Sequence, residues 1–221
     1  MDLTAVTVPA SWVAAAWALA APVLLFAVRV APWQRFRASE PVHVWYGTIF
    51  CLVALWSIQA TVGDGFTFHL LGVAAFTLIA GAPLALAGTA IAVAVNVAVR
   101  GGLWANAALV WLTMAAIPVG ATWLVLRLAE RALPANFFVY IFVATFLGAA
   151  LSLAAAGLAG AALLALAAGL PTELVFGEYV PYLLYLAFGE ATLTGMLVTL
   201  AVAYRPQWVA TFDDARYLKD R

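Results

Sequence analysis

The sequence is poor in charged residues. Only 9% of its 221 residues are Asp, Glu, Lys or Arg, whereas 67% are hydrophobic and the mean hydropathy is +1.07. A soluble domain carries about a quarter charged residues. The formal net charge is zero, so no basic surface for nucleic acid is expected. The composition therefore predicts an integral membrane protein that contacts lipid and has no separate soluble domain.

Other absences exclude several kinds of functional site. The single cysteine, Cys51, excludes an intrachain disulfide and a cysteine metal cluster. The chain contains no Gly-x-x-x-x-Gly-Lys-Ser/Thr motif, so it has no P-loop of its own for ATP hydrolysis. Its first residues lack the basic segment of a signal peptide, and we expect none to be cleaved. Histidine clusters and carboxylates paired at helical spacing are also missing, and we expect no enzyme.

Apolar stretches of membrane-spanning length recur along the chain. We expect an all-α bundle of seven transmembrane helices in a single domain over residues 1–221. Pro- and Gly-containing turns separate them, as at Gly63-Asp64-Gly65 and Gly81-Ala82-Pro83. The predicted helices cover residues 10–31, 42–62, 66–83, 84–100, 104–130, 136–169 and 179–204.

The basic residues predict the orientation, because cytoplasmic loops carry an excess of Lys and Arg. With the N-terminus outside and the C-terminus cytoplasmic, only Arg100 falls on the outer side. The other basic residues all fall on the cytoplasmic side: Arg29, Arg35, Arg37, Arg127, Arg131, Arg205, Arg216, Lys219 and Arg221. We expect a multi-pass protein of the bacterial inner membrane.

A lone carboxylate, Glu190, lies inside the last apolar stretch. An ionised group within a bilayer costs several kcal/mol unless it has partners, so it indicates a functional site. The predicted topology places other polar side chains in the outer half of the bundle: Gln59, Asp64, His69, Asn96 and Asn106. Each also has a structural explanation, as a turn residue, an interfacial residue or a hydrogen-bonding group between helices. For Glu190 the structural alternative is a carboxyl group that bonds a neighbouring helix.

Three segments together carry a family resemblance. They are His69-Leu70-Leu71-Gly72 with 77–83; Ala105-Asn106 with Met114-Ala115-Ala116-Ile117-Pro118-Val119-Gly120; and Phe188-Gly189-Glu190-Ala191. In this order and spacing the chain resembles the substrate-capture permeases (S components) of energy-coupling-factor transporters of the cobalt/nickel type. The resemblance covers about residues 66–204.

The resemblance implies a metal-ion capture protein that works with a transmembrane coupling protein and ATPase subunits of an ABC transporter. By position, His69 inherits the role of a metal ligand. The family's other ligands come from an N-terminal Met-His, whereas this chain begins Met1-Asp2 and lacks that imidazole. Asp2 offers an oxygen instead, which does not reproduce a square-planar nitrogen site suited to Ni²⁺. The chain is therefore identified as a divergent branch of the family.

Three functions follow as hypotheses. The first is a capture component for a divalent transition metal ion, with His69 as a ligand and Asp2 or Asp64 as helpers. Glu190 and Asn106 would support the pocket, with Asn96 and Gln59 nearby. The ion would be substrate, and no permanently bound cofactor is expected. The second is a stand-alone secondary or proton-coupled permease that uses Glu190, and the third is a structural or assembly subunit of a larger membrane complex.

Overall fold

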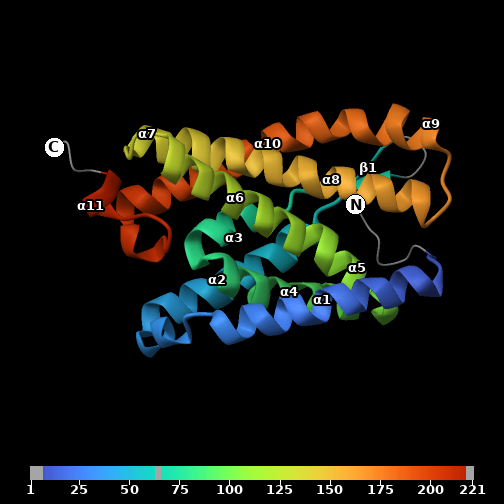
Figure 1. Cartoon of the computed structure of the whole chain (residues 1–221), viewed down its shortest axis with the longest axis horizontal. Coiled ribbons are helices and arrows are strands. Elements are labelled where there is room, and N and C mark those ends of the chain that lie inside the picture. Colours follow the sequence, from blue (N-terminus) through green and yellow to red (C-terminus); the bar gives the residue numbers. More distant parts are fainter. Residues whose placement is uncertain (1–6, 63–65, 218–221) are drawn as a thin grey trace.

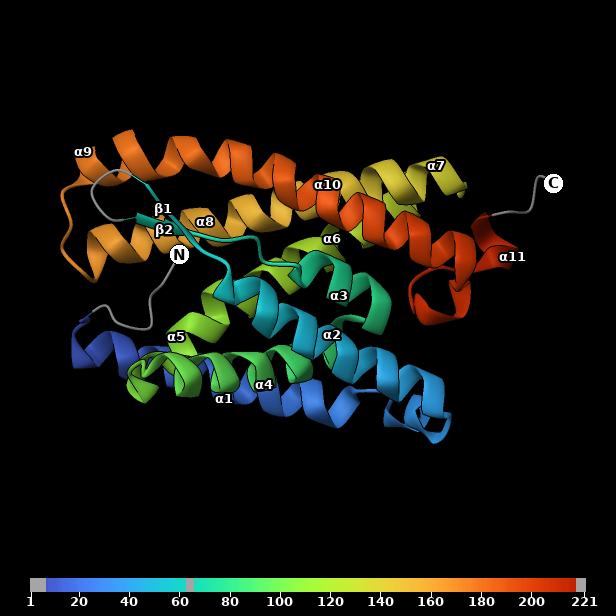
Figure 2. The same ribbon diagram turned by 180° about the vertical axis from the view of Figure 1, so that it is seen from behind.

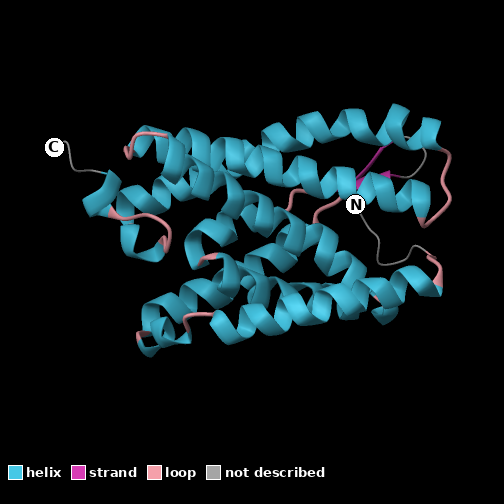
Figure 3. Cartoon of the chain, viewed as in Figure 1, coloured by secondary structure: helices cyan, strands magenta, loops and turns pink. Residues whose placement is uncertain are grey.

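The computed structural model is a bundle of helices with one short hairpin, and it describes residues 7–62 and 66–217 (Figures 1 and 3). Its α-helices are α1 (Ala10–Val30), α2 (Ser39–Ser57), α3 (Val73–Ala80), α4 (Ala82–Arg100), α5 (Ala107–Trp111), α6 (Ile117–Ala132), α7 (Phe137–Val139), α8 (Gly148–Leu166), α9 (Thr172–Leu174), α10 (Val180–Tyr204) and α11 (Asp214–Tyr217). The antiparallel hairpin pairs β1 (Ala60–Val62) with β2 (Phe66–Phe68). Short 3₁₀ turns occupy Trp33–Arg37, Trp104–Asn106 and Pro206–Trp208.

Three long helical rods contain π-helical turns. The turns are Leu112–Ala116 between α5 and α6, Tyr140–Leu147 between α7 and α8, and Val175–Tyr179 between α9 and α10. Each turn joins its neighbours into one continuous rod. The last rod begins at Thr172, seven residues before the helix predicted at 179–204.

Within the described residues, five helical segments are long and apolar enough to cross a membrane. They are Ala10–Val30, Ala82–Arg100, Trp104–Ala132, Phe137–Leu166 and Thr172–Tyr204. The predicted helices at 10–31, 84–100, 104–130 and 136–169 correspond to four of them. Helix α2 is long enough, but Glu40 and His43 in its first turns lower its apolarity, and it is not among the five. The count of seven spans and the orientation of the chain remain predictions.

The prediction of a continuous helix over 66–83 is wrong, and the helix predicted at 42–62 is too long. Helix α2 ends at Ser57, and residues 60–62 and 66–68 pair as strands. Five of these six residues, Thr61, Val62, Phe66, Thr67 and Phe68, are β-branched or aromatic, which favours strands. Helix α3 then has only eight residues, about 12 Å at 1.5 Å per residue, too short for a bilayer core of about 30 Å.

Helix α3 lies at the centre of the bundle (Figure 2). It packs against α2, α4, α6, α8 and α10, and all its residues except Ile79 are buried. A helix that is apolar on every side belongs inside a bundle rather than against solvent. Gly88 of α4 lets α3 and α4 approach closely, because a Cβ at this position would lie 2.6 Å from Cζ of Phe76 in α3. The chain segment before α3 is therefore held deep within the protein.

The described basic residues other than Arg100 gather at one end of the bundle, as the charge pattern predicts. The ends of α1, α6 and α10 and the start of α2 lie at that end, whereas Arg100 at the end of α4 lies at the other (Figure 1). Glu130 forms ion pairs there with Arg127 at 2.8 Å and Arg216 at 3.3 Å. Burial, with Glu130 nearby, raises the pKa of the Tyr217 phenol at this end. We call this the basic end.

Substitution of Gly72 tests whether stability depends on the bend before α3. Its φ is +66°, and an added Cβ would lie 2.9 Å from Leu52 Cδ2 and 3.0 Å from Leu55 Cδ2. We expect Gly72→Ala to lower the free energy of unfolding by about 1–3 kcal/mol, because an L side chain is strained there. Thermal unfolding in detergent measures this. The control is Gly47→Ala in α2, where nothing lies within 4 Å of the new Cβ; equal melting temperatures for both variants would contradict the prediction.

Candidate functional site

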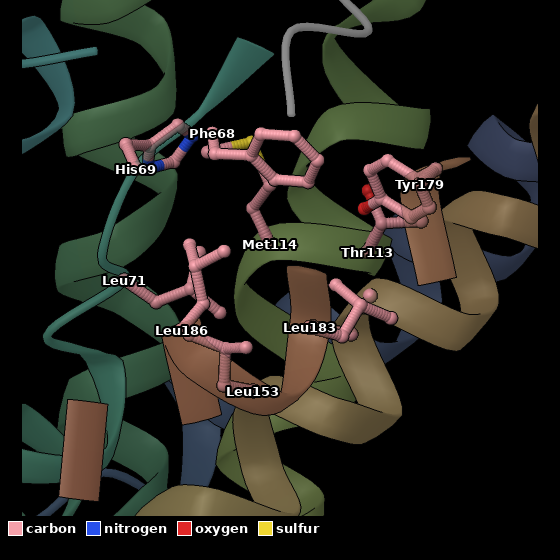
Figure 4. A pocket seen from close by; sticks show the side chains of 11 residues that line it. Phe68, His69, Leu71, Thr113, Met114, Leu153, Tyr179, Leu183 and Leu186 are labelled. Carbon is pink, nitrogen blue, oxygen red and sulfur yellow. The ribbon is translucent and has the colours of Figure 1, made fainter. Parts of the chain in front are cut away.

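His69 lies in a non-helical segment, residues 69–72, between β2 and α3. Its side chain is 7% exposed and lines a small cavity of about 30 Å³ (Figure 4). That volume holds one or two water molecules or an ion. The wall is mostly apolar and comes from the segment around His69, the rod that contains Met114, α8 and the rod that contains Tyr179. The site is thus built from four parts of the chain that are far apart in sequence.

Glu190 of α10 accepts hydrogen bonds from the backbone of this segment. Its side chain is fully buried, and its Oε2 and Oε1 accept hydrogen bonds from the backbone N–H groups of Leu71 at 2.8 Å and Gly72 at 2.7 Å. Both oxygens accept a hydrogen bond, as expected for an ionised carboxylate, which has acceptors only. The carboxylate also lies at the N-terminus of α3, where the helix dipole favours negative charge. The structure therefore gives Glu190 a definite partner: the backbone immediately after His69.

Two further residues support this segment, one directly and one through the other. Trp56 Nε1 donates to the Leu71 carbonyl at 2.9 Å, and Arg100 donates to the Trp56 carbonyl at 2.8 Å. Non-helical backbone is tolerated at membrane depth only when its polar groups find partners within the protein. Glu190 and Trp56 supply these partners for Leu71. The one basic residue predicted on the outer side, Arg100, is thus part of the framework around the segment.

The hydrogen bond of the His69 ring identifies its tautomer. Nδ1 lies 3.0 Å from the Leu70 carbonyl oxygen, which is an acceptor, so Nδ1 carries the proton in this contact. In the neutral ring, Nε2 then holds the lone pair. Metal-ligating histidines commonly donate their other ring N–H to a carbonyl or carboxylate in this way. The ring is therefore in a form that can coordinate a metal ion through Nε2.

Two π-helical turns supply polar atoms to the cavity wall. Thr113 and Met114 come from the turn Leu112–Ala116, and Tyr179 comes from the turn Val175–Tyr179. Single π-helical turns often occur at functional sites because they alter the direction of nearby side chains. The Thr113 hydroxyl lies 2.8 Å from the Leu109 carbonyl and 3.2 Å from that of Val110, so it donates within its own helix. Tyr179 stacks on Phe68, with ring centroids 5.1 Å apart.

The structure brings together some of the predicted site residues and separates others. His69 and Glu190 belong to one assembly, joined through the backbone of residues 70–72. Asn96 and Asn106 are buried in α4 and in the turn before α5, and Gln59 is half-buried before β1. None of these three lines the cavity with His69. Asp2 and Asp64, the predicted helpers, lie outside the described residues, and their roles remain predictions.

Sequence reasoning did not assign roles to Trp56, Met114 or Tyr179. Met114 lies in a segment that carries the family resemblance, but nothing in the sequence indicates that it lines the same cavity as His69. Trp56 is one of nine tryptophans, and its ring N–H meets a carbonyl 15 residues away only after the hairpin has formed. In the described part of the chain, no group of three or more His, Cys, Asp or Glu residues is arranged to hold a metal ion.

The fold defines a multi-pass membrane protein with a small cavity inside the bundle. A family model described as the cobalt uptake substrate-specific transmembrane region, CbiM, matches residues 3–208. The chain belongs to this family, and it is a component of a metal uptake system rather than an enzyme. This confirms the family suggested by the three sequence segments.

Comparison with solved structures supports the same fold. One crystal structure, described as a transition metal transporter, superimposes with a TM-score of 0.76 at 18% identity over 92% of this chain and 93% of that one. A second, described as a truncated transition metal transporter, gives a TM-score of 0.72 at 16% identity over 89% and 96%. No curated protein matches the chain. At these identities the likeness establishes the arrangement of the helices.

Substitution of Glu190 tests its support of the segment. In Glu190→Gln one oxygen still accepts, but the amide NH₂ faces a backbone N–H that has lost its acceptor. We expect a loss of about 1–3 kcal/mol in the free energy of unfolding, and a larger loss for Glu190→Ala. The matched control is Glu173→Gln, because Glu173 is exposed at the start of α9. A Glu190→Gln variant as stable as this control would contradict the assignment.

Proposed function

We propose that this chain is the substrate-capture component of an energy-coupling-factor uptake system in the bacterial inner membrane. It binds a transition metal ion from the outer side with His69 as a ligand. The observation that carries the proposal is the small cavity that His69 lines, together with the hydrogen bonds of Glu190 and Trp56 to the backbone next to it. The family description names cobalt uptake, and the sequence predicts a divalent ion.

The framework explains how a single histidine can serve as a positioned ligand. The Leu70 carbonyl fixes the ring tautomer, and Glu190 and Trp56 fix the backbone that follows. Outer partners of this kind orient metal ligands and raise their affinity for the ion. Glu190 therefore acts as a positioning residue, whose carboxylate reaches the backbone rather than the ion. Asp2 and Asp64 remain proposed helpers from the segments next to the site.

The orientation supports capture from outside. The basic end would face the cytoplasm by the charge rule. The hairpin, whose Phe68 lines the cavity, lies toward the opposite end of the bundle (Figure 2). ATP-driven uptake through a chain without a P-loop needs partners that bind ATP. We therefore propose a transmembrane coupling protein and ATPase subunits as partners, which would contact the bundle within the membrane and at its basic end.

Substitution of His69 tests metal capture. We expect His69→Ala to abolish the rise in melting temperature that transition metal ions give the wild type in detergent, because a principal ligand is lost. The matched control is His43→Ala, since His43 is exposed near the basic end and its ring contacts the carbonyl of Ser39 in its own helix. If His69→Ala keeps the full metal response, His69 is not the ligand.

Transport in liposomes tests the need for partners. We expect the purified chain alone to give no uptake of radiolabelled metal ion, and the same chain with coupling protein and ATPases to give ATP-dependent uptake. The alternative permease that uses Glu190 predicts uptake by the chain alone, lost in Glu190→Gln. Uptake without partners would overturn the capture proposal. Co-purification with a non-transport complex, with no effect of His69→Ala, would point to a structural subunit.

A further inference from the structure

The chain that follows α10 caps the last turn of α3. The last carbonyls of a helix have no partner within it, and Leu78 near the end of α3 is fully buried. The N–H of Ala210 donates to the Ile79 carbonyl at 2.9 Å. Thr211 donates twice to the Leu78 carbonyl, from its N–H at 3.3 Å and from its hydroxyl at 2.8 Å. Ala210 and Thr211, which we call the clamp, thus supply partners that lipid cannot offer.

The opposite end of α3 is held by α10 itself. Glu190 accepts hydrogen bonds from the N–H groups of Leu71 and Gly72, directly before α3. Helix α10 also packs against α3, and the chain after α10 turns back to the end of α3 (Figure 2). At that end Arg35 adds a hydrogen bond to the Ala80 carbonyl at 3.2 Å. A helix of eight residues, about 12 Å long, therefore joins the segment 69–72 to the clamp at the basic end.

We propose that Thr211 is a positioning residue for the His69 site and acts on it through α3. The inference rests on the proposed function, because it concerns the affinity for the ion that His69 binds. In the clamped state, α3 and the segment before it are fixed against α10. When the clamp opens, the Leu78 and Ile79 carbonyls lose these partners, the last turn of α3 is released, and the segment that carries His69 is less firmly placed.

The two states give the clamp control over the affinity of the site. An ion that needs His69 in its fixed position binds the clamped state more tightly than the open state. By thermodynamic linkage, closing the clamp raises the affinity for the ion, and the ion favours the closed clamp by the same factor. Ala210 is exposed at the basic end, where the proposed partners would contact the bundle. A partner that draws this segment away from α3 therefore lowers the affinity and favours release of the ion.

Calorimetric titration of the purified full chain with Co²⁺ in detergent tests the role of the Thr211 hydroxyl. Thr211→Val keeps the shape of the side chain, and we expect it to weaken Co²⁺ binding about two- to tenfold, the range that one neutral hydrogen bond spans. Thr211→Ser keeps the hydroxyl and should restore the wild-type affinity. The matched control is Thr48→Val, because the Thr48 hydroxyl donates at 2.8 Å to the Val44 carbonyl of its own helix; its affinity should equal that of the wild type.

A second variant separates the two hydrogen bonds of this hydroxyl. Thr211 Oγ1 donates to Leu78 and accepts from the Tyr140 hydroxyl at 2.7 Å, so Thr211→Val breaks both bonds. Tyr140→Phe breaks only the second, and we expect it to keep the wild-type Co²⁺ affinity. An equal loss of affinity in Tyr140→Phe and Thr211→Val would place the effect outside α3 and overturn the proposal.

Hydrogen exchange measures the reciprocal effect without a substitution in the clamp. In the wild type, Co²⁺ should slow exchange of the Ala210 and Thr211 amides about twofold or more, as read in peptides that cover 205–212. His69→Ala should abolish this protection. The control is the turn at 133–136, which follows α6 at the same end of the bundle, and its amides should be protected less.

The outcomes separate this inference from the proposed function. If Co²⁺ binds in a His69-dependent manner but Thr211→Val keeps the wild-type affinity, or Thr211→Ser binds as weakly as Thr211→Val, the positioning role is overturned and metal capture stands. The same holds if Co²⁺ protects 205–212 no more than the control turn, and this measurement decides alone if Thr211→Val does not fold. If the wild type binds no Co²⁺ and His69→Ala changes nothing, both proposals fail.

Discussion

The contact between the Glu190 carboxylate and the backbone N–H groups of Leu71 and Gly72 is the interaction on which the site depends. It joins α10 to a segment more than 100 residues earlier in the chain. It gives a buried carboxylate two donors, and it gives two buried donors an acceptor. In an apolar bundle neither group has water as an alternative, so leaving either one unpaired is costly. The same contact fixes where the His69 segment ends and α3 begins.

The arrangement of the bundle follows from this contact. Because residues 69–72 have no helical structure, α3 is short, and the hairpin β1–β2 precedes it in the chain (Figure 2). The two π-helical turns next to the cavity add side chains from other helices to the wall around His69. The site is therefore a local break in regular structure, supported by regular helices on all sides. Such breaks in membrane proteins occur where a cavity or ligand needs backbone and side chains at membrane depth.

The sequence predicted the class, the family and most helices, but it placed a helix where the site lies. The stretch 66–83 is apolar throughout, and hydropathy alone does not distinguish a spanning helix from a buried hairpin, bend and short helix. Gly72 carried a clue, since a glycine after His-Leu-Leu can adopt positive φ, but the partner that stabilises the bend is Glu190. Likewise Asn96 and Asn106 share the predicted outer half with His69, yet neither lines the cavity.

The sequence by itself determined that this is a helical membrane protein and which helix ends carry its basic residues. It also singled out His69 and Glu190 as polar residues in apolar stretches. These follow from composition and local spacing, which depend on residues near one another in the chain. Only the tertiary structure decided that Glu190 holds the backbone after His69, that Trp56 completes this support, and that Met114 lies on the same cavity wall. The physical reason is that these relations depend on the packing and rotation of helices from distant segments, which residue type and period do not specify.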